Sequence, residues 1–185
     1  MGGLLVFTTE RKNNAFALFF LLCFFAGIAV EVIGTSTGWL FGHYAYGKML
    51  GPVIMDVPIL IGINWFIIMY CCGVSIHMLH SSLSASRPQT KTLMSKNFKM
   101  FSVLIDGALL AVFFDWVMEP VAIKLGYWQW LADGEIPLYN YICWFAISVL
   151  LLFVFQKLPF TKQNKFAVNL LLIQAMFFLL LRTFL

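Results

Sequence analysis

Long apolar runs alternate with short polar connections along the chain. Five runs are long enough to cross a bilayer, because a spanning helix needs about 20 mostly apolar residues. The predicted spans are residues 15–33, 58–78, 101–118, 137–156 and 166–184. The pattern therefore predicts an all-α, polytopic membrane helix bundle that forms one integral-membrane domain over residues 1–185.

The composition supports a membrane protein. Of the 185 residues, 62% are apolar and 11% are charged, whereas a soluble domain has about 45–50% apolar and about 25% charged residues. The first apolar run is long enough to span the bilayer, so we expect it to be a retained helix and not a cleaved signal peptide. All four cysteines lie in apolar runs without a CxxC pair, which argues against a zinc site or a disulfide framework.

Basic residues predict the orientation of the helices, because cytoplasmic connections carry an excess of Lys and Arg. The second connection, residues 79–100, contains four basic residues and no acid. The N-terminal segment and the fourth connection are also basic, whereas the first and third connections are not. We therefore expect a cytoplasmic N-terminus, in a bacterial cytoplasmic membrane. The net charge of +4 then reflects topology, and no nucleic-acid partner is expected.

The first connection, residues 34–57, is too apolar for an ordinary polar loop. It contains Trp39, Leu40, Phe41, Tyr44, Tyr46, Met49 and Leu50. The third connection, residues 119–136, has a similar character, with Tyr127, Trp128 and Trp130. Because Trp and Tyr favour the membrane interface, we expect both connections to lie on the bilayer surface or to dip into the bundle as re-entrant loops.

The chain also resembles itself after a shift of 84 residues. The shift places Glu31 on Asp115, Gly42 on Gly126, Tyr44 on Trp128 and Tyr46 on Trp130; with a loop shortened by five residues, Trp65 falls on Trp144. We interpret this as a parallel repeat with halves at about 15–78 and 99–156, and with the helix at 166–184 outside it. The alternative is the common use of aromatic residues at interfaces and of proline at helix starts.

Carboxyl groups inside the spans are the candidates for chemistry, because ionisable residues in a membrane cost free energy. Glu31 and Asp115 lie roughly 24 Å and 21 Å from the inner ends of their predicted helices, at about 1.5 Å per residue. Glu119 follows Asp115 by four residues and shares its helix face. We expect a functional role for this group, with helix packing or hydration as the alternative. Asp106 lies on the opposite face, where a structural pair with a neighbouring helix is expected.

A carboxyl group among aromatic side chains is suited to acid catalysis. Burial disfavours the charged form of a carboxyl group, and a neutral carboxyl can act as a general acid. Aromatic faces can stabilise a developing cation. Protonation of an alkene and proton-coupled transport both fit this arrangement. The three histidines are too few for a membrane di-iron oxygenase, and we interpret His77 and His80 as interfacial side chains.

Two motifs carry a family resemblance. The first reads E-x-x-G-x-x-x-G-x-x-F-G-x-Y-x-Y from Glu31 to Tyr46 and continues with V-P-x-x-I at 57–61. The second reads DWVMEPVAIKLGYWQW from Asp115 and continues as IPLYNYICW. Over about residues 25–150 the chain resembles the CruF-type carotenoid biosynthesis proteins, which are membrane carotenoid 1,2-hydratases.

The resemblance implies addition of water across the terminal double bond of an acyclic carotenoid, with no metal or other cofactor. We expect the substrate to arrive from the lipid bilayer, and we expect association with other carotenoid-biosynthesis enzymes. Our candidate catalytic residues are Glu31, Asp115 and Glu119. Our candidates for substrate binding are Tyr44, Tyr46, Asn64, Trp65, Trp128, Trp130, Asn140 and Trp144.

Alternative functions use the same residues. If water is excluded, acid-initiated chemistry closes a ring, as in a lycopene-type carotenoid cyclase. A small proton-coupled transporter would use Glu31 and Asp115 as a proton relay. A membrane scaffold without enzymatic activity would not need carboxyl groups at matched depth in both halves.

Overall fold

The computed structural model describes residues 14–86, 96–131 and 134–185, and this part of the chain folds into a bundle of five long helices. Their bounds are α2 Asn14–Thr37, α3 Ile59–Ser86, α5 Lys96–Lys124, α6 Leu138–Lys157 and α7 Lys165–Phe184. Each helix is long and apolar enough to cross a membrane. The prediction of an all-α, polytopic membrane bundle with five spans is confirmed.

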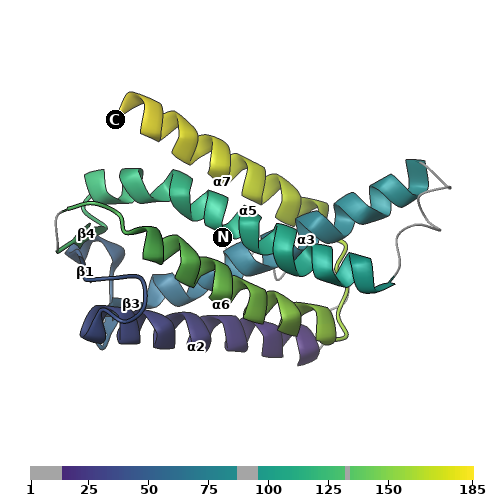
Figure 1. Cartoon of the computed structure of the whole chain (residues 1–185), viewed down its shortest axis with the longest axis horizontal. Coiled ribbons are helices and arrows are strands. Elements are labelled where there is room, and N and C mark those ends of the chain that lie inside the picture. The colour runs from purple at the N-terminus through teal and green to yellow at the C-terminus, as the bar shows by residue number, and fades with distance from the viewer. Residues whose placement is uncertain (1–13, 87–95, 132–133) are drawn as a thin grey trace.

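The helices alternate in direction, so their connections gather at two ends of the bundle (Figure 1). Residues 37–59, 124–131 and 134–138 lie at one end, together with the short strands, and we call it the strand end. The start of α7 and the ends of α3 and α6 lie toward the other end. Helix α2 packs against α3, and α5 packs against α6. The two predicted halves therefore each contain a pair of packed helices.

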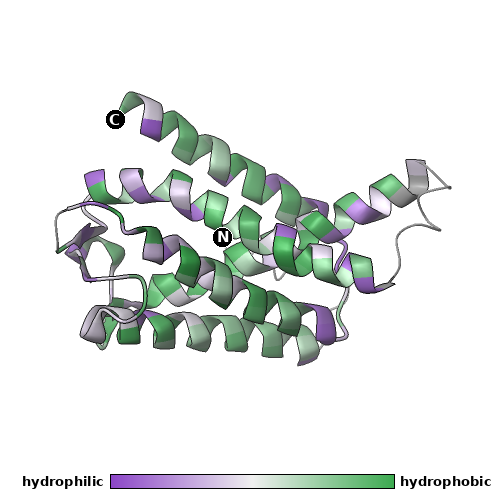
Figure 2. Ribbon diagram, viewed as in Figure 1, coloured by the Kyte–Doolittle hydropathy of each residue, from purple (hydrophilic) through white to green (hydrophobic). Residues whose placement is uncertain are grey.

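Apolar side chains cover the outside of the bundle, and the helix ribbons are hydrophobic over most of their length (Figure 2). On α7, Leu172, Ile173 and Met176 are each more than half exposed. A surface of this kind suits lipid, because hydrocarbon does not penalise apolar side chains as water does. The outer surface agrees with a multi-pass membrane protein.

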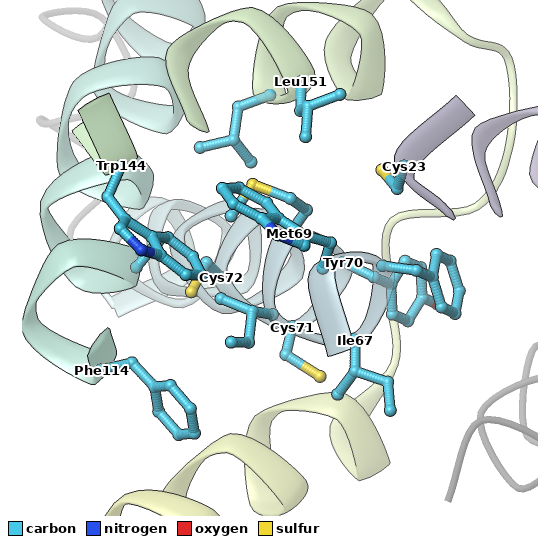
Figure 3. Close-up of a cluster of buried hydrophobic side chains, with 14 of the residues drawn as sticks. Cys23, Ile67, Met69, Tyr70, Cys71, Cys72, Phe114, Trp144 and Leu151 are labelled. Atoms are coloured by element: carbon cyan, nitrogen blue, oxygen red, sulfur yellow. The ribbon is translucent and has the colours of Figure 1, made fainter. Parts of the chain in front are cut away.

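Helix α3 forms the centre of the bundle. About 67% of its spanning window is buried, compared with 17% for α7, which lies at the periphery. Cys71 and Cys72 are fully buried in the core, within the cluster of apolar side chains drawn in Figure 3. The core is also rich in aromatic contacts, and Tyr70 packs against Phe16, Phe66 and Phe155 in this region.

Helix α5 is longer than predicted, because Pro120 does not end it. The predicted span stopped at residue 118, whereas the helix continues to Lys124. Proline lacks an N–H and leaves the carbonyl four residues earlier without its helical partner. That carbonyl belongs to Trp116, and it accepts a hydrogen bond of 2.9 Å from Arg182 Nη1 on α7. Membrane helices tolerate proline where a neighbouring helix supplies the missing donor in this way.

Helices α2 and α3 also extend beyond their predicted spans, which ended at residues 33 and 78. Three hydroxyl side chains end α2, and each donates to a carbonyl of the preceding turn. They belong to Thr35, Ser36 and Thr37. The accepting carbonyls belong to Glu31, Val32 and Ile33, whose helical N–H donors four residues on lie within α2, so these hydroxyl groups add second hydrogen bonds to the last turns of the helix.

Short antiparallel strands, which the sequence did not predict, order the aromatic connections. Strand β1, Tyr44–Tyr46, pairs with β4, Trp128–Trp130, and β2, Val53–Ile54, pairs with β3, Val57–Pro58. A 3₁₀ helix, η1, spans Lys48–Leu50. Gly126, at a φ of 70°, ends α5, and the bond from Tyr127 N to Ala122 O completes a Schellman motif. This turn directs the chain from α5 into β4.

Asp106 is exposed on α5 and accepts a hydrogen bond from Ser102. The Ser102 hydroxyl also lies 2.8 Å from His80 Nε2 on α3. The expected link between Asp106 and a neighbouring helix therefore passes through Ser102. His80 is only 8% exposed and faces α5, so its ring packs within the bundle near the end of the α3 span, and its interfacial position stays a prediction.

Candidate active site

A small cavity lies near the strand end, between elements of the two predicted halves. Its lining consists of Glu31, Phe41, Tyr44, Tyr46, Ile61, Asn64, Trp65, Asp115, Met118, Glu119, Trp128, Trp130, Asn140 and Trp144. Every candidate residue from the sequence is in this set. Helices α2, α3, α5 and α6 contribute to the wall, and β1 and β4 close it. The predicted residues are thus brought together, although their roles stay predictions.

Glu31 is the most heavily hydrogen-bonded carboxyl group of the cavity. Its Oε2 accepts from the hydroxyl groups of Tyr44 and Tyr46, the latter at 2.7 Å. Its Oε1 accepts from Trp65 Nε1 at 3.0 Å. Hydrogen bonds to a carboxylate favour its charged form, so these three donors are arranged for a negative charge on a side chain that is only 5% exposed.

Tyr44 and Tyr46 act as neutral donors in this arrangement. Burial raises the pKa of both phenols, and the nearby Glu31 carboxyl raises the pKa of each further. Because the unperturbed pKa of tyrosine is already about 10, both side chains keep their protons at neutral pH. Each can therefore donate its O–H to Glu31 throughout the physiological range.

Glu119 and Asp115 have different surroundings from Glu31. Glu119 Oε2 accepts from two indoles, at 3.0 Å from Trp128 Nε1 and 3.2 Å from Trp130 Nε1. Asp115 Oδ2 accepts one hydrogen bond, of 2.8 Å, from Asn140 Nδ2. Asp115 is 1% exposed and Glu119 is 3% exposed. The three carboxyl groups thus accept three, two and one hydrogen bonds from the described residues.

Strands β1 and β4 come from different predicted halves, and their antiparallel pairing joins these halves. Tyr44 lies opposite Trp130, Ala45 opposite Gln129 and Tyr46 opposite Trp128. The 84-residue shift superimposes Ala45 on Gln129, so the central pair of the ribbon joins corresponding positions. At the edge of the ribbon, Gly47 passes so close to the carbonyl of Gly126 that a side chain would not fit. This arrangement supports our interpretation of a repeat, which stays a proposal.

Aromatic rings form one wall of the cavity. The rings of Trp65 and Trp144 stack with their centroids 4.0 Å apart and their planes 10° apart. The Phe41 ring lies against both indoles, with centroid distances of 6.4 Å and 6.5 Å. Since Trp65 also donates to Glu31, the position of the stack is coupled to that of the carboxyl group.

Three further residues line the cavity but were not predicted as site residues: Phe41, Ile61 and Met118. Phe41 is 2% exposed and has a φ of 68°, a conformation that is uncommon for a residue with a Cβ. Phe41 and Ile61 both occur in the quoted motif. The signal for Phe41 was its place in that motif, directly before Gly42. Met118 is an apolar residue between Asp115 and Glu119. Nothing in the sequence distinguishes it from other apolar residues of the same span.

The cavity has a volume of about 30 Å³ for the centres of water-sized molecules. A buried site needs about 10–15 Å³ on this measure to hold one water. The space is therefore suited to one or two waters beside the carboxyl groups. Among the described residues, no group of three or more His, Cys, Asp or Glu side chains is placed to hold a metal ion.

Spanning helices around buried carboxyl and indole groups define a polytopic membrane protein with a small acidic cavity. A family model described as "Carotenoid biosynthesis protein" matches residues 3–185. The chain therefore belongs to the carotenoid biosynthesis protein family. This result confirms the family resemblance found from the two motifs.

One curated relative carries a functional name. The chain is 27% identical over 152 residues to a bisanhydrobacterioruberin hydratase from Haloarcula japonica. The match covers 79% of this chain and 47% of the relative, so the chain spans about half the length of that protein. No solved structure matches the chain.

Proposed function

We propose that the protein is a carotenoid 1,2-hydratase, which adds water across the terminal double bond of an acyclic carotenoid end group. The main support is that three buried carboxyl groups, from two different helices, line one small cavity. Two stacked indoles form part of the wall of this cavity. The family match and the name of the hydratase relative support the same reaction class.

Asp115 is the proton donor in this proposal. Three carboxyl groups around one small cavity would repel one another if all were charged, so at least one of them carries a proton. Asp115 accepts the fewest hydrogen bonds of the three and is almost fully buried. The Asn140 amide donates to one oxygen of Asp115, which leaves the other oxygen to carry the proton.

The reaction begins when the Asp115 proton is transferred to C2 of the end group. The π electrons of the double bond form the new C2–H bond, and the positive charge develops at the tertiary carbon C1. A water molecule in the cavity then forms a bond from its oxygen to C1. Glu31 or Glu119 receives the proton that this water loses, and the product is a tertiary alcohol.

Glu31 and the indole wall stabilise the cation. The three donors around Glu31 favour its negative charge, and a negative charge stabilises a cation that forms nearby. The Trp65–Trp144 stack, which lines the cavity, adds cation–π attraction. Asn64, which also lines the cavity, is a candidate for orienting the water.

Entry of the substrate requires local movement. A cavity of about 30 Å³ holds water but not a branched hydrocarbon end group. Phe41, β1 and β4 belong to connections and not to spanning helices, so a shift of these lining elements would leave the helix bundle in place. We propose that the end group enters laterally from the bilayer as these connections shift.

Pigment analysis tests the proposed function. The chain is expressed in cells that make a carotenoid with open ends, such as bisanhydrobacterioruberin, the compound for which the relative is named. Extracts are analysed by chromatography and mass spectrometry. A new pigment with the mass of the substrate plus one water is the expected result. Unchanged pigments, despite a folded protein in the membrane, would overturn the proposal.

The same experiment separates the alternatives. A product of unchanged mass with a new ring would identify a cyclase. Proton uptake into vesicles that contain the purified protein, without any change in the pigment, would identify a proton-coupled transporter. Incorporation of oxygen from ¹⁸O-labelled water into the product distinguishes hydration from both.

A further inference from the structure

A second, larger cavity lies toward the other end of the bundle, where α3, α5 and α6 meet. We call it the basic pocket. It is lined by His77, His80, Ser81, Asn97, Lys99, Met100, Val103, Gln156 and Lys157. Its volume is about 480 Å³, which is within the range of ligand sites.

The side chains of the basic pocket are mainly hydrogen-bond donors. Lys99 and Lys157 carry positive charge, and no acidic residue is among the described residues that line the pocket. Nδ1 of His77 and Nδ1 of His80 are buried and have no hydrogen-bond partner among the described residues. Both nitrogens are enclosed by protein, so the features that indicate a ligand are the open volume of the pocket and its two lysines.

A further lysine lies close to the pocket but is already engaged. Lys162 donates to the carbonyl of Leu158 at 2.9 Å and lies over the rings of Phe155 and Phe160. Burial lowers the pKa of Lys162. Its interactions hold it beside the pocket. Lys99 and Lys157 are the cations of the lining itself; Lys157 Nζ lies 5.1 Å from the centre of the Phe153 ring and, among the described residues, has no hydrogen bond to a backbone carbonyl such as Lys162 makes.

The ends of the spans place the basic pocket at the level of the lipid headgroups. The span of α3 ends at Leu83, the span of α5 begins at Asn97, and the span of α6 ends at Lys157. The lining residues thus lie within about two turns of the ends of three spans. Basic pockets between helices on the cytoplasmic side of a membrane commonly bind the headgroups of anionic lipids, and the basic connections predict that side here.

We propose that the basic pocket binds a phosphate group, which Lys99 and Lys157 pair by charge and which the polar lining residues hydrogen-bond. The phosphate belongs either to an anionic phospholipid of the surrounding leaflet or to a soluble phosphate. The carotenoid has no charge, so this site is separate from the proposed hydration and does not depend on it.

Native mass spectrometry and thermal unfolding test the proposal. Full-length protein is purified in neutral detergent, stripped of lipid, and offered phosphatidylglycerol or phosphatidylcholine with the same acyl chains. We expect retention of phosphatidylglycerol, and about tenfold weaker binding after Lys99→Gln or Lys157→Gln, because a hydrogen bond to a charged group is lost. A second arm adds inorganic phosphate and measures the shift in unfolding temperature.

Lys124→Gln is the matched control, because Lys124 is exposed and ends the same helix α5 near the strand end. Retention of phosphatidylglycerol that depends on Lys99 and not on Lys124 supports a lipid site. A shift with inorganic phosphate alone, with the same dependence, supports a soluble phosphate. Equal losses in all three variants, or no preference for either probe in folded protein, would overturn the proposal.

Discussion

In the repeat that we propose, Glu31 corresponds to Asp115, but the surroundings of the two carboxyl groups differ. Glu31 accepts hydrogen bonds from two phenols and one indole. Asp115 accepts one bond from an amide, and the indoles that correspond to Tyr44 and Tyr46 donate to Glu119 instead. The first half therefore favours the charged form of its carboxyl group, Glu31. The second half gives Asp115 only one hydrogen bond from the described residues, so it stabilises the charged form of that group less. An acid and a base in one cavity need such a difference.

Asp115→Asn should have the largest effect on activity. The amide keeps the size of the side chain but cannot give a proton to C2, and general acid catalysis contributes about 100-fold to 10,000-fold. We expect the rate of hydration to fall by about 1,000-fold, measured as product formed per folded protein in membrane vesicles.

Asp106→Asn is the matched control for this prediction, because Asp106 lies on the same helix but is exposed and outside the cavity. It should keep its activity within about twofold, as expected for a surface substitution. Full activity of Asp115→Asn would remove Asp115 as the acid and would assign that role to Glu31 or Glu119.

Glu31→Gln should have a smaller effect, of about 100-fold on the rate. The substitution removes the negative charge that stabilises the cation. It also replaces one carboxyl oxygen by an N–H₂ group, which then faces either the Trp65 N–H or the hydroxyl groups of Tyr44 and Tyr46. We therefore also expect a lower unfolding temperature. If Glu31→Gln reduced the rate more than Asp115→Asn did, Glu31 would be the proton donor and Asp115 the carboxylate that stabilises the cation.

The helical part of the fold and the members of the site could be predicted from sequence because each depends on local chemistry. Apolar runs of spanning length gave the five helices, and Glu31 and Asp115 are unusual residues for such runs. Hydrogen-bond partners could not be predicted in this way. Trp128 and Trp130 reach Glu119 and not Asp115 because the Schellman turn at Gly126 sets the path into β4.

The strands and the ends of the helices depended on contacts between distant segments. The pairing of Tyr44 with Trp130 joins residues far apart in sequence, and neither short segment has the alternating pattern of a longer strand. The continuation of α5 through Pro120 depends on Arg182 from another helix. Local patterns do not contain this information.

Trp65 and Trp144 offer a sharper comparison within the stack. Both rings are buried and parallel, but Trp65 donates to Glu31. Changing either residue to Phe removes a similar ring from the stack, so the shared packing cost cancels in the comparison. Trp65→Phe should reduce the rate about tenfold more than Trp144→Phe, because it also removes a hydrogen bond to a charged group. Equal effects would show that Trp65 contributes only through packing, and that its hydrogen bond to Glu31 does not affect the rate.

The smallest predicted effect is on stability. It concerns α7, which lies outside the predicted repeat. In the second half, Pro120 leaves the carbonyl of Trp116 without its helical donor, and Arg182 of α7 supplies one while lying 3.9 Å from the centre of the Trp116 ring. Arg182→Met should lower the free energy of unfolding by about 1–2 kcal/mol, measured by thermal or denaturant unfolding in detergent. In a Pro120→Ala background the alanine N–H can bond to that carbonyl, so the same substitution should cost less. If Arg182→Met lowered the free energy of unfolding equally with Pro120 in place and in the Pro120→Ala background, Arg182 would stabilise the protein only through its contact with the Trp116 ring. The hydrogen bond to the Trp116 carbonyl would then contribute nothing.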